Sequence, residues 1–447
     1  MSNNILAGIM GLSVADALGV PVEFVDRKTL KNNPVVGVRA YGTYNQPAGT
    51  WSDDSSMTLC LLDSLANGID YTDIMNNFQK WFDKGLYTPH GEAFDIGIST
   101  RKALKRFAAG TNPLDCGGTT ELDNGNGSLM RILPAVFYLQ SSYGDKELDE
   151  AAFDIIHNIS ALTHAHKRSK IACGIYLSIA LNLENGKELK QAVDQGLYAA
   201  ANYYKTDAEF TDELQYFNRL TRKDFDELPE KLIKSSGYVV DTLEASIWCL
   251  LTTTSYKECI LKAVNLGEDT DTVAAVAGGL AGLCYGYESI PDEWLAALEK
   301  RDYIESICDK FSVSLKKTDI EKLCNYIPYF EVATKESVCE WSGGEKQEEN
   351  VYTMPYPVYE KTLKEFIGAV YSTNLMHHDY VKATEELAIE NSQELMNIIE
   401  TANFDTLRAI LTNYVRQERF SDGLWANATG EKTFLQILKR FQQLSSA

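Results

Sequence analysis

Apolar residues up to about residue 330 recur at spacings of three and four positions, which is typical of helices that bury one face. Runs that alternate apolar and polar residues, as half-buried strands do, are scarce. The pattern therefore predicts an all-α domain. Its clearest helices are expected at Met57–Ala66, Ile74–Phe82, Ile98–Phe107, Ala151–Leu162, Ile171–Leu183, Leu243–Leu251 and Val273–Tyr285.

The character of the sequence changes after residue 333. Residues 334–353 are rich in Glu and contain Ser342-Gly343-Gly344, a composition typical of a linker. Residues 354–447 then show helical patterns of their own, which predict a second, smaller helical domain. We expect a first domain over residues 1–333, with a polar insertion at about 194–236. The helices expected in the second domain are Thr362–Tyr371, Tyr380–Ile389, Leu395–Ile399, Thr406–Tyr414 and Thr433–Leu444.

Charge and cysteine content narrow the class of protein. The 447 residues include 42 Lys and Arg against 63 Asp and Glu, a net charge of −21. Nucleic acids and anionic membranes bind cationic surfaces, so we expect neither as a partner. The apolar run from Ile5 to Val22 has no Lys or Arg before it and is interrupted by Asp16, unlike a signal peptide. Nine cysteines without a C-x-x-C pair indicate reduced thiols, and we expect a cytoplasmic protein.

Two acidic clusters stand at predicted helix starts, Ser52-Asp53-Asp54 and Glu268-Asp269-Thr270-Asp271-Thr272. Helix capping explains the first cluster on its own, with Ser52 as the N-cap. Capping needs fewer side chains than the second cluster supplies, and the small residues after Thr272 predict a buried helix. Buried carboxylates are costly unless they are paired or bind a metal. Carboxylate and hydroxyl oxygens suit Mg²⁺, Mn²⁺ or Ca²⁺.

Three further segments carry weaker signals. Asp16 lies among apolar neighbours, and Glu23 follows a Gly/Pro break. The segment from Asn124 to Ser128 is a Gly/Asn loop running into an apolar helix, where backbone N–H groups can cradle a phosphate, although an ordinary turn is the simpler interpretation. His164 and His166 lack further ligands at zinc spacing, which favours hydrogen-bonded loop histidines or a substrate contact.

Together these motifs resemble the ADP-ribosylglycohydrolase family, over about residues 5–330. The resemblance rests on six motifs in the family's order, which are far more specific together than any one alone. They are Gly11-x-x-x-Ala15-Asp16-Ala17-Leu18-Gly19-x-Pro21-x-Glu23, Trp51-Ser52-Asp53-Asp54, Phe94-Asp95-Ile96-Gly97-x-x-Thr100-Arg101, Gly125-Asn126-Gly127-Ser128-x-Met130-Arg131, Thr163-His164-x-His166 and Asp269-Thr270-Asp271-Thr272.

The resemblance implies an orthogonal helical bundle around two Mg²⁺ ions in a cleft, with Mn²⁺ as an alternative ion. The metal ligands that it implies are Ser52, Asp53, Asp54, Asp269, Asp271 and Thr272. The implied catalytic residues are Glu23, Asp54 and Asp95. The implied substrate-binding residues are Asn124, Gly125, Asn126, Gly127, Ser128, Met130, Arg131 and His164. Ala15 replaces a common Gly and Ser52 a usual Thr, but neither change removes a metal carboxylate.

The implied activity is hydrolysis of the glycosidic bond between ADP-ribose and a protein side chain, through an Arg or a Ser linkage. Glycosidases usually stabilise the oxocarbenium-like transition state with two carboxylates. Here we expect the cations to share that role by holding ribose hydroxyls and making a water more acidic. Glu23 or Asp54 would be the general base, and Asp95 would protonate the leaving group. The alternatives are a hydrolase of a free ADP-ribose conjugate and a non-catalytic protein that binds ADP-ribose or a partner protein.

Overall fold

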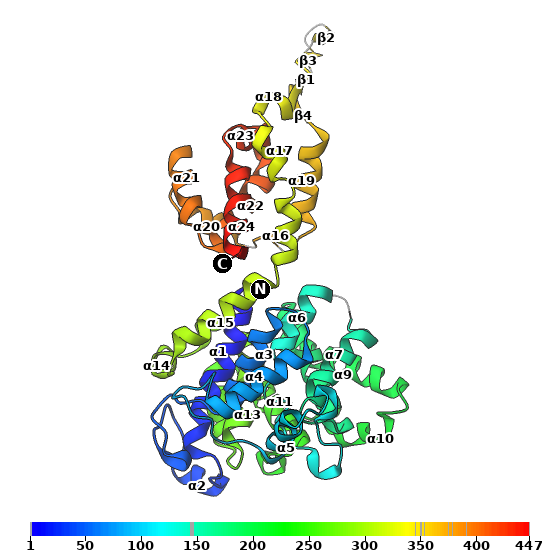
Figure 1. Cartoon of the computed structure of the whole chain (residues 1–447), viewed down its shortest axis with the longest axis vertical. Helices are drawn as coiled ribbons and strands as arrows, with labels where there is room; N and C mark the ends of the chain where they lie inside the picture. The colour runs from blue at the N-terminus through cyan, green and yellow to red at the C-terminus, as the bar shows by residue number, and fades with distance from the viewer. Residues whose placement is uncertain are drawn as a thin grey trace. The chain divides into compact units, whose positions relative to one another are not determined.

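The computed structural model describes residues 2–446 except 144–146, 345, 349–350, 353, 374, 378 and 390. The chain divides into two compact units, Met1–Ser312 and Val313–Ala447 (Figure 1). Unit 1 is helical, as predicted. Its α-helices are α1 (Ser2–Gly19), α2 (Arg27–Asn32), α3 (Asp53–Leu65), α4 (Tyr71–Lys84), α5 (Ile98–Ala108), α6 (Pro134–Tyr143), α7 (Glu150–Ala161), α8 (Lys167–Glu184), α9 (Leu189–Thr206), α10 (Thr211–Leu214), α11 (Val239–Leu251), α12 (Tyr256–Val264), α13 (Thr270–Tyr285), α14 (Asp292–Ala297) and α15 (Arg301–Ser314). Its 3₁₀ turns are η1 (Val20–Val22), η2 (Gly42–Tyr44), η3 (Pro113–Asp115), η4 (Glu121–Asp123), η5 (Gln215–Phe217), η6 (Glu230–Leu232) and η7 (Tyr287–Ser289).

The core of unit 1 is built on α1 and α13, which lie against each other (Figure 1). Small residues let the two backbones approach closely. A Cβ atom at Gly11 would lie 2.5 Å from the carbonyl oxygen of Gly278, and one at Gly278 would lie 2.6 Å from the Cβ of Ala15. The Gly/Ala run after Thr272 therefore exists because larger side chains would force these two helices apart.

The end of α1 is tied to the starts of both α3 and α13. Asp16 accepts hydrogen bonds from the backbone N–H of Ser52 at 3.0 Å and of Ser55 at 3.0 Å. Thr270 donates to the carbonyl oxygen of Gly19 at 2.8 Å, and a side chain at Gly19 would overlap the backbone of Asp271. These contacts bring two helix N-termini, each carrying acidic residues, to the same end of α1.

The apolar segment at the N-terminus is a core element of this unit. Residues Asn4–Val22 have the length and hydropathy of a membrane-spanning helix, but 94% of that window is buried inside the structure. The core helix of a globular domain passes the same test, and packing of α1 against α13 accounts for its apolar composition.

Unit 2 is also helical, but it contains four short strands that the sequence pattern did not predict. β1 pairs antiparallel with β4, and β2 with β3. Its strands are β1 (Cys339–Ser342), β2 (Lys346–Glu348), β3 (Val351–Tyr352) and β4 (Tyr356–Tyr359). Its helices are α16 (Lys317–Cys324), α17 (Ile327–Val332), α18 (Lys335–Val338), α19 (Lys361–Tyr371), α20 (Tyr380–Glu385), α21 (Ser392–Thr401), α22 (Phe404–Gln417), η8 (Glu418–Phe420), α23 (Leu424–Gly430) and α24 (Thr433–Ser446).

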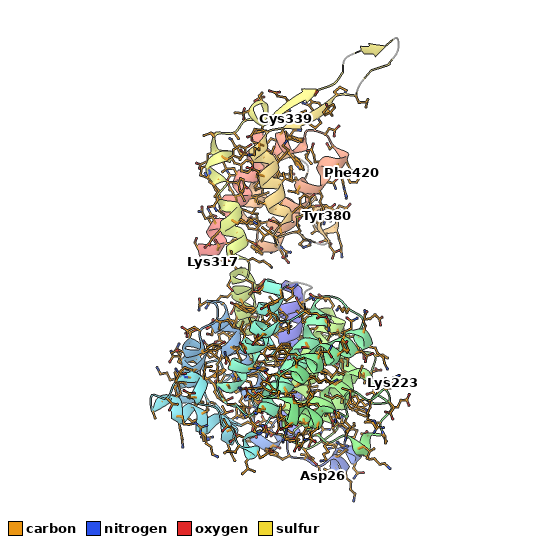
Figure 2. The ribbon with its side chains drawn as sticks, turned by 90° about the vertical axis from the view of Figure 1, so that its right-hand side faces the viewer. Asp26, Lys223, Lys317, Cys339, Tyr380 and Phe420 are labelled. Carbon is orange, nitrogen blue, oxygen red and sulfur yellow. The ribbon has the colours of Figure 1, made fainter. Side chains whose placement is uncertain are left out.

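The boundary between the units differs from the expected one. Unit 2 begins at Val313, not at 354 after a linker over 334–353. Ile320, Leu323 and Phe330 pack in the same core as Phe366 and Phe434. In Figure 2, Lys317 and Cys339 accordingly belong to the same unit as Tyr380 and Phe420. The polar composition that suggested a linker belongs to the β1–β4 region within unit 2, where positions 345, 349, 350 and 353 lie outside the described residues.

The expected insertion also starts at a different place. Residue 194 lies within α9, which continues to Thr206. The irregular part follows it, runs from 207 to 236 and includes α10, η5 and η6. This part, called the insertion segment below, packs through α10 on α8 and α9 and so belongs to unit 1.

Candidate active site

Carboxylates from four separate segments converge at the end of α1. One oxygen each of Asp16, Asp54 and Asp271 lies within 4.8 Å of the others, and the same holds for Glu23, Asp269 and Asp271. Asp271 belongs to both groups. The two acidic clusters predicted at helix starts therefore meet in space, at the N-termini of α3 and α13.

Burial and mutual repulsion raise the pKa of these carboxyl groups. The pKa values of Asp53, Asp54 and Asp271 lie well above the ordinary value, chiefly because the groups are desolvated and also because other carboxylates surround them. Burial, then the charges of Asp95 and Asp269, raise the pKa of Glu23 to about 9. The cluster therefore favours binding positive charge, whether protons or metal ions.

Unpaired oxygens in this cluster fit a metal ion. Among the described residues, Glu23 Oε2, Asp54 Oδ1 and Asp271 Oδ2 are buried without a hydrogen-bond partner. A buried oxygen of this kind is costly unless something satisfies it. Carboxylate oxygens are the ligands that hard divalent cations prefer. The donor set therefore suits a cation such as Mg²⁺ or Mn²⁺.

The six predicted metal ligands lie in the first turns of α3 and α13 or at their caps, and all are buried except Asp269, which is half-buried. Ser52 caps α3 as predicted, and its Oγ donates to Asp54 Oδ2 at 2.9 Å. Asp269 Oδ2 accepts from the side chain of Asn126 at 2.8 Å. Asp53 lies outside the two groups of three, although its pKa responds to Asp54 and Asp95. These positions form one site, in which the ligand roles remain a prediction.

Asp16 has a different environment from its neighbours. Its two oxygens accept from the backbone N–H groups of Ser52 and Ser55, and the Ser55 hydroxyl donates to it at 2.6 Å. Burial raises its pKa to about 6, and these hydrogen bonds oppose the rise. We assign Asp16 to holding the start of α3 in place.

Tyr44 is a site residue that sequence reasoning missed. Its hydroxyl donates to Asp95 Oδ1 at 2.5 Å, and its ring packs 5.1 Å from that of Phe94. Asp95 has a left-handed backbone (φ +54°) and is half-buried, and its charge helps to raise the pKa of Glu23. Tyr44 ends the turn η2 and has no motif around it, so only the fold reveals that it orients Asp95.

The Gly/Asn loop lies beside this cluster. The side chain of Asn126 donates to Asp269, and its backbone N–H donates to the carbonyl oxygen of Gly237 at 3.1 Å. A Cβ atom at Gly127 would lie 2.8 Å from His164 Cε1, so glycine is needed for this approach. The loop does not run directly into a helix as expected, because α6 begins only at Pro134. Its phosphate-binding capacity would come from loop N–H groups, not from a helix N-terminus.

Three predicted substrate contacts lie in the interior of unit 1. Ser128 is fully buried and its hydroxyl accepts from that of Ser160 at 2.9 Å. Arg131 is also fully buried, donates to the carbonyl oxygens of Gly127 and Ile159, and stacks on Phe78. Met130 is buried as well. The side chains of Ser128, Met130 and Arg131 therefore support the loop from beneath, and substrate binding by these three residues stays a prediction.

His164 is buried and neutral near pH 7. Burial, and then the charge of Arg131, lower its pKa to about 3. One ring nitrogen, Nδ1, lies 2.8 Å from the Thr163 hydroxyl, while the other edge of the ring faces Gly125 and Gly127. His164 can therefore offer a neutral nitrogen beside the loop.

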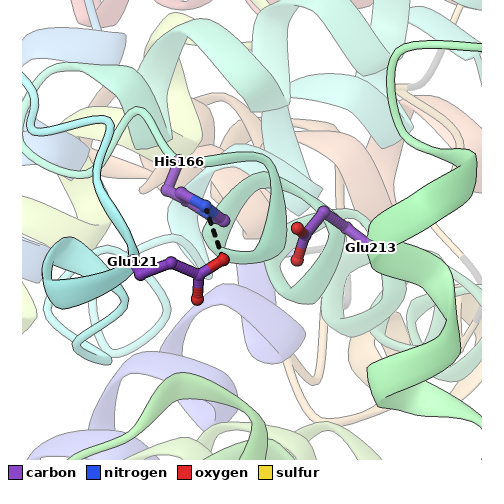
Figure 3. A group of neighbouring side chains, drawn as sticks. All are labelled: Glu121, His166 and Glu213. Atoms are coloured by element: carbon purple, nitrogen blue, oxygen red, sulfur yellow. Dashed lines mark ion pairs between the residues drawn. The ribbon is translucent and has the colours of Figure 1, made fainter.

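Glu121, His166 and Glu213 form a third group with the spacing of metal ligands (Figure 3). His166 Nε2 lies 3.8 Å from Glu121 Oε1. Arg168, however, already pairs with both carboxylates, at 3.1 Å from Glu121 and 2.7 Å from Glu213. Because the guanidinium of Arg168 already pairs with both acids, we interpret this group as an ion-pair cluster, not a metal site.

An all-α unit with an oxygen-rich acidic site beside a Gly/Asn loop is the arrangement that the resemblance to the ADP-ribosylglycohydrolase family implies. Comparison with known proteins agrees. Residues 1–320 match the ADP-ribosylglycohydrolase family, and the chain belongs to that family. Residues 315–447 match a family of unknown function (DUF6508), which agrees with the start of unit 2 at Val313.

Individual relatives give the same result. The chain is 32% identical over 318 residues to the ADP-ribosylarginine hydrolase Tri1 of Serratia proteamaculans, covering 68% of this chain and 77% of the relative. It is 29% identical over 313 residues to the ADP-ribosyl-[dinitrogen reductase] glycohydrolase of Rhodospirillum rubrum, covering 66% and 90%. A solved structure titled "ADP-ribosylglycohydrolase-related protein complex" matches with a TM-score of 0.55 and 30% identity, over 69% of this chain and 97% of that one.

Proposed function

We propose that this protein is a Mg²⁺-dependent hydrolase that releases ADP-ribose from arginine side chains of ADP-ribosylated proteins. The observation that carries the proposal is that two sets of three carboxylates meet in space and share Asp271. Three of their oxygens are buried without a hydrogen-bond partner among the described residues. The arginine linkage is supported by the similarity to an ADP-ribosylarginine hydrolase. With Mn²⁺ as an alternative ion, the cations would be held by the six residues predicted as ligands.

Divalent cations bound there would neutralise the carboxylates, hold sugar hydroxyls and make a nearby water more acidic. The ligands would be the acidic and hydroxyl side chains at the starts of α3 and α13. Two hydroxyl groups, those of Ser52 and Thr272, already donate to Asp54 Oδ2. We therefore assign Asp54 to the metal site and leave the role of general base to Glu23.

In the proposed reaction, water attacks C1″ of the ribose, and the bond from C1″ to the arginine nitrogen breaks. Cations bound beside it would return Glu23 to its charged form, in which it would accept a proton from the attacking water. Asp95 gives a proton to the departing arginine nitrogen. The Tyr44 hydroxyl, 2.5 Å from Asp95 Oδ1, fixes the orientation of that carboxyl group.

The ADP-ribose itself is expected to lie along the loop from Asn124 to Gly127. Backbone N–H groups of this loop can hold the diphosphate without a positive side chain. His164 is neutral and lies against Gly127, so it offers a hydrogen bond without adding charge. Arg131 and Ser128 keep the loop in this shape from within the core.

We further propose that the protein works in the cytoplasm on ADP-ribosylated protein partners. All nine cysteines are free thiols, which suits a reducing compartment. The relatives from S. proteamaculans and R. rubrum are both named for removal of ADP-ribose from a modified substrate.

The test is incubation with separate peptides carrying ADP-ribose on Arg, on Ser or on Asp/Glu, with Mg²⁺, while free ADP-ribose is measured. We expect release from the Arg peptide. Release only from the Ser peptide would contradict the proposed arginine linkage. Binding of ADP-ribose without release from any peptide would instead favour a non-catalytic binding protein.

A further inference from the structure

Arg168, in the first turn of α8, joins three segments of unit 1. Its side chain is only 4% exposed. Its Nε donates to Glu213 Oε2 at 2.7 Å, and its Nη1 donates to the hydroxyl of Tyr238 at 3.0 Å. Its Nη2 donates to Glu121 Oε1 at 3.3 Å. One buried guanidinium therefore holds η4, the insertion segment and the start of α11 together (Figure 3 shows the two glutamates).

The insertion segment supplies the strongest of the interactions that hold Arg168. Glu213 in α10 is 16% exposed, whereas Glu121 is 66% exposed, so water weakens the Glu121 pair more. Tyr216, in η5, stacks on the guanidinium with its ring centre 3.5 Å from the Arg168 Cζ. A planar guanidinium that stacks on a ring and forms ion pairs is fixed in orientation.

The other two partners of Arg168 flank the Gly/Asn loop. Glu121 begins η4, which leads directly into Asn124, and the Asn124 side chain donates to the carbonyl oxygen of Glu121 at 3.2 Å. Tyr238 forms a bridge with Gly125 and follows Gly237, which accepts from the Asn126 backbone. Arg168 thus holds both edges of the loop without belonging to it.

We propose that the insertion segment sets the affinity for the ADP-ribose part of the substrate by positioning the Gly/Asn loop through Arg168. Arg168 is a positioning residue, and Glu213 and Tyr216 are the parts of the insertion segment that act on it. This inference rests on the proposed function, because it takes the loop as the ADP-ribose site. The chemistry at Glu23 and Asp95 is not involved, so the effect falls on binding.

The experiment compares full-length wild type with Glu213→Gln, Tyr216→Leu and Arg168→Lys. Isothermal titration gives the Kd for ADP-ribose, and release of ADP-ribose from the Arg peptide gives KM and kcat. Asp224→Asn is the matched control, because it breaks the Arg222–Asp224 pair of the same segment, which is exposed and 2.7 Å long. Thermal melts identify any variant that fails to fold, and the remaining variants then decide the result.

We expect each of the three variants to raise Kd and KM about tenfold, with kcat within about twofold of wild type. Asp224→Asn should leave all three values unchanged. Glu213→Gln in an Arg168→Lys background should raise Kd little further, because both changes remove the same ion pair. An unchanged Kd in folded Glu213→Gln and Tyr216→Leu, or a loss of kcat at constant KM, would overturn the proposal. If wild type binds ADP-ribose but releases none, the proposed function fails, and the Kd comparison alone decides this inference.

Discussion

Thr272, at the start of α13, donates a hydrogen bond of 3.3 Å to Asp54, at the start of α3, although 218 positions separate them in the sequence. The accepting oxygen, Asp54 Oδ2, also receives the hydroxyl of Ser52. The other oxygen, Oδ1, has no partner among the described residues. Two helix N-termini therefore hold one carboxylate with one oxygen left available, which is the arrangement a bound cation needs.

Replacing Asp271 by Asn should abolish release of ADP-ribose. The side chain keeps its shape but loses the charge that serves both carboxylate groups. We expect a loss of about a thousandfold or more, since a misplaced cation forfeits several kcal/mol of transition-state stabilisation. Asp83→Asn, at an exposed position of α4, is the control and should have full activity. Full activity of Asp271→Asn would refute the site.

Divalent cations should raise the melting temperature of the wild type. In their absence the buried carboxylates repel one another and must take up protons. A cation at about 100 times its Kd stabilises the folded state by about 2.7 kcal/mol, or several degrees for unit 1. Calorimetric scans in Mg²⁺ and in EDTA measure this shift. Asp271→Asn should show a much smaller shift, and equal melting of the wild type in both buffers would argue against a metal site.

Gly19→Ala should disrupt the site from outside it. The new methyl group would overlap the backbone of Asp271, and overpacking of this kind costs about 1–3 kcal/mol. We expect a lower unfolding free energy and lower activity together. The control is Gly368→Ala in α19, where a Cβ meets nothing within 4 Å; it should be neutral or slightly stabilising. Wild-type activity of Gly19→Ala would show that the close contact is not required.

His157 should make the protein less stable in mild acid. It is buried, lies 2.9 Å from the Tyr204 hydroxyl, and burial followed by the charge of Lys170 lowers its pKa from 6.5 to about 3. As the pH falls, His157 thus becomes protonated near pH 6.5 in the unfolded chain but only near pH 3 in the folded chain. The stability present above pH 6.5 therefore falls as pH drops, by up to about 1.4 kcal/mol per pH unit.

Urea unfolding of wild type and His157→Gln between about pH 7 and pH 4.5 measures this effect. The difference between the two free energies of unfolding should change with pH in favour of the variant at low pH. Parallel pH profiles of the two proteins would contradict the assignment of His157 as a neutral buried group.

Truncation should distinguish the observed domain boundary from the one that composition suggests. A chain of residues 1–333 carries Ile320, Leu323 and Phe330 without the core into which they pack, so we expect it to aggregate. A chain of residues 1–314, which keeps α15 whole, should stay monodisperse in light scattering and hydrolyse a small test substrate. Loss of cation binding in the shorter chain would show that unit 1 needs unit 2.

Local sequence patterns predicted much of this fold, because helix formation and capping depend on residues that are close together in the sequence. The helix periodicity gave α3, α8 and α13 near their observed positions, and the acidic clusters marked the two helix starts that meet. Properties set by tertiary packing were not predictable. Nothing near Arg131 in the sequence indicates that its charge is buried beneath the Gly/Asn loop, and Tyr44 has no motif that links it to Asp95. The domain boundary was misplaced because composition reports polarity, not which core a helix such as α16 joins.

The most direct test of the account is release of ADP-ribose from an Arg-ADP-ribosylated peptide by the wild-type chain in Mg²⁺, in excess EDTA, and after Mg²⁺ is restored. The account predicts release with Mg²⁺, loss of release with EDTA, and recovery when the ion returns. Undiminished release in EDTA would contradict it.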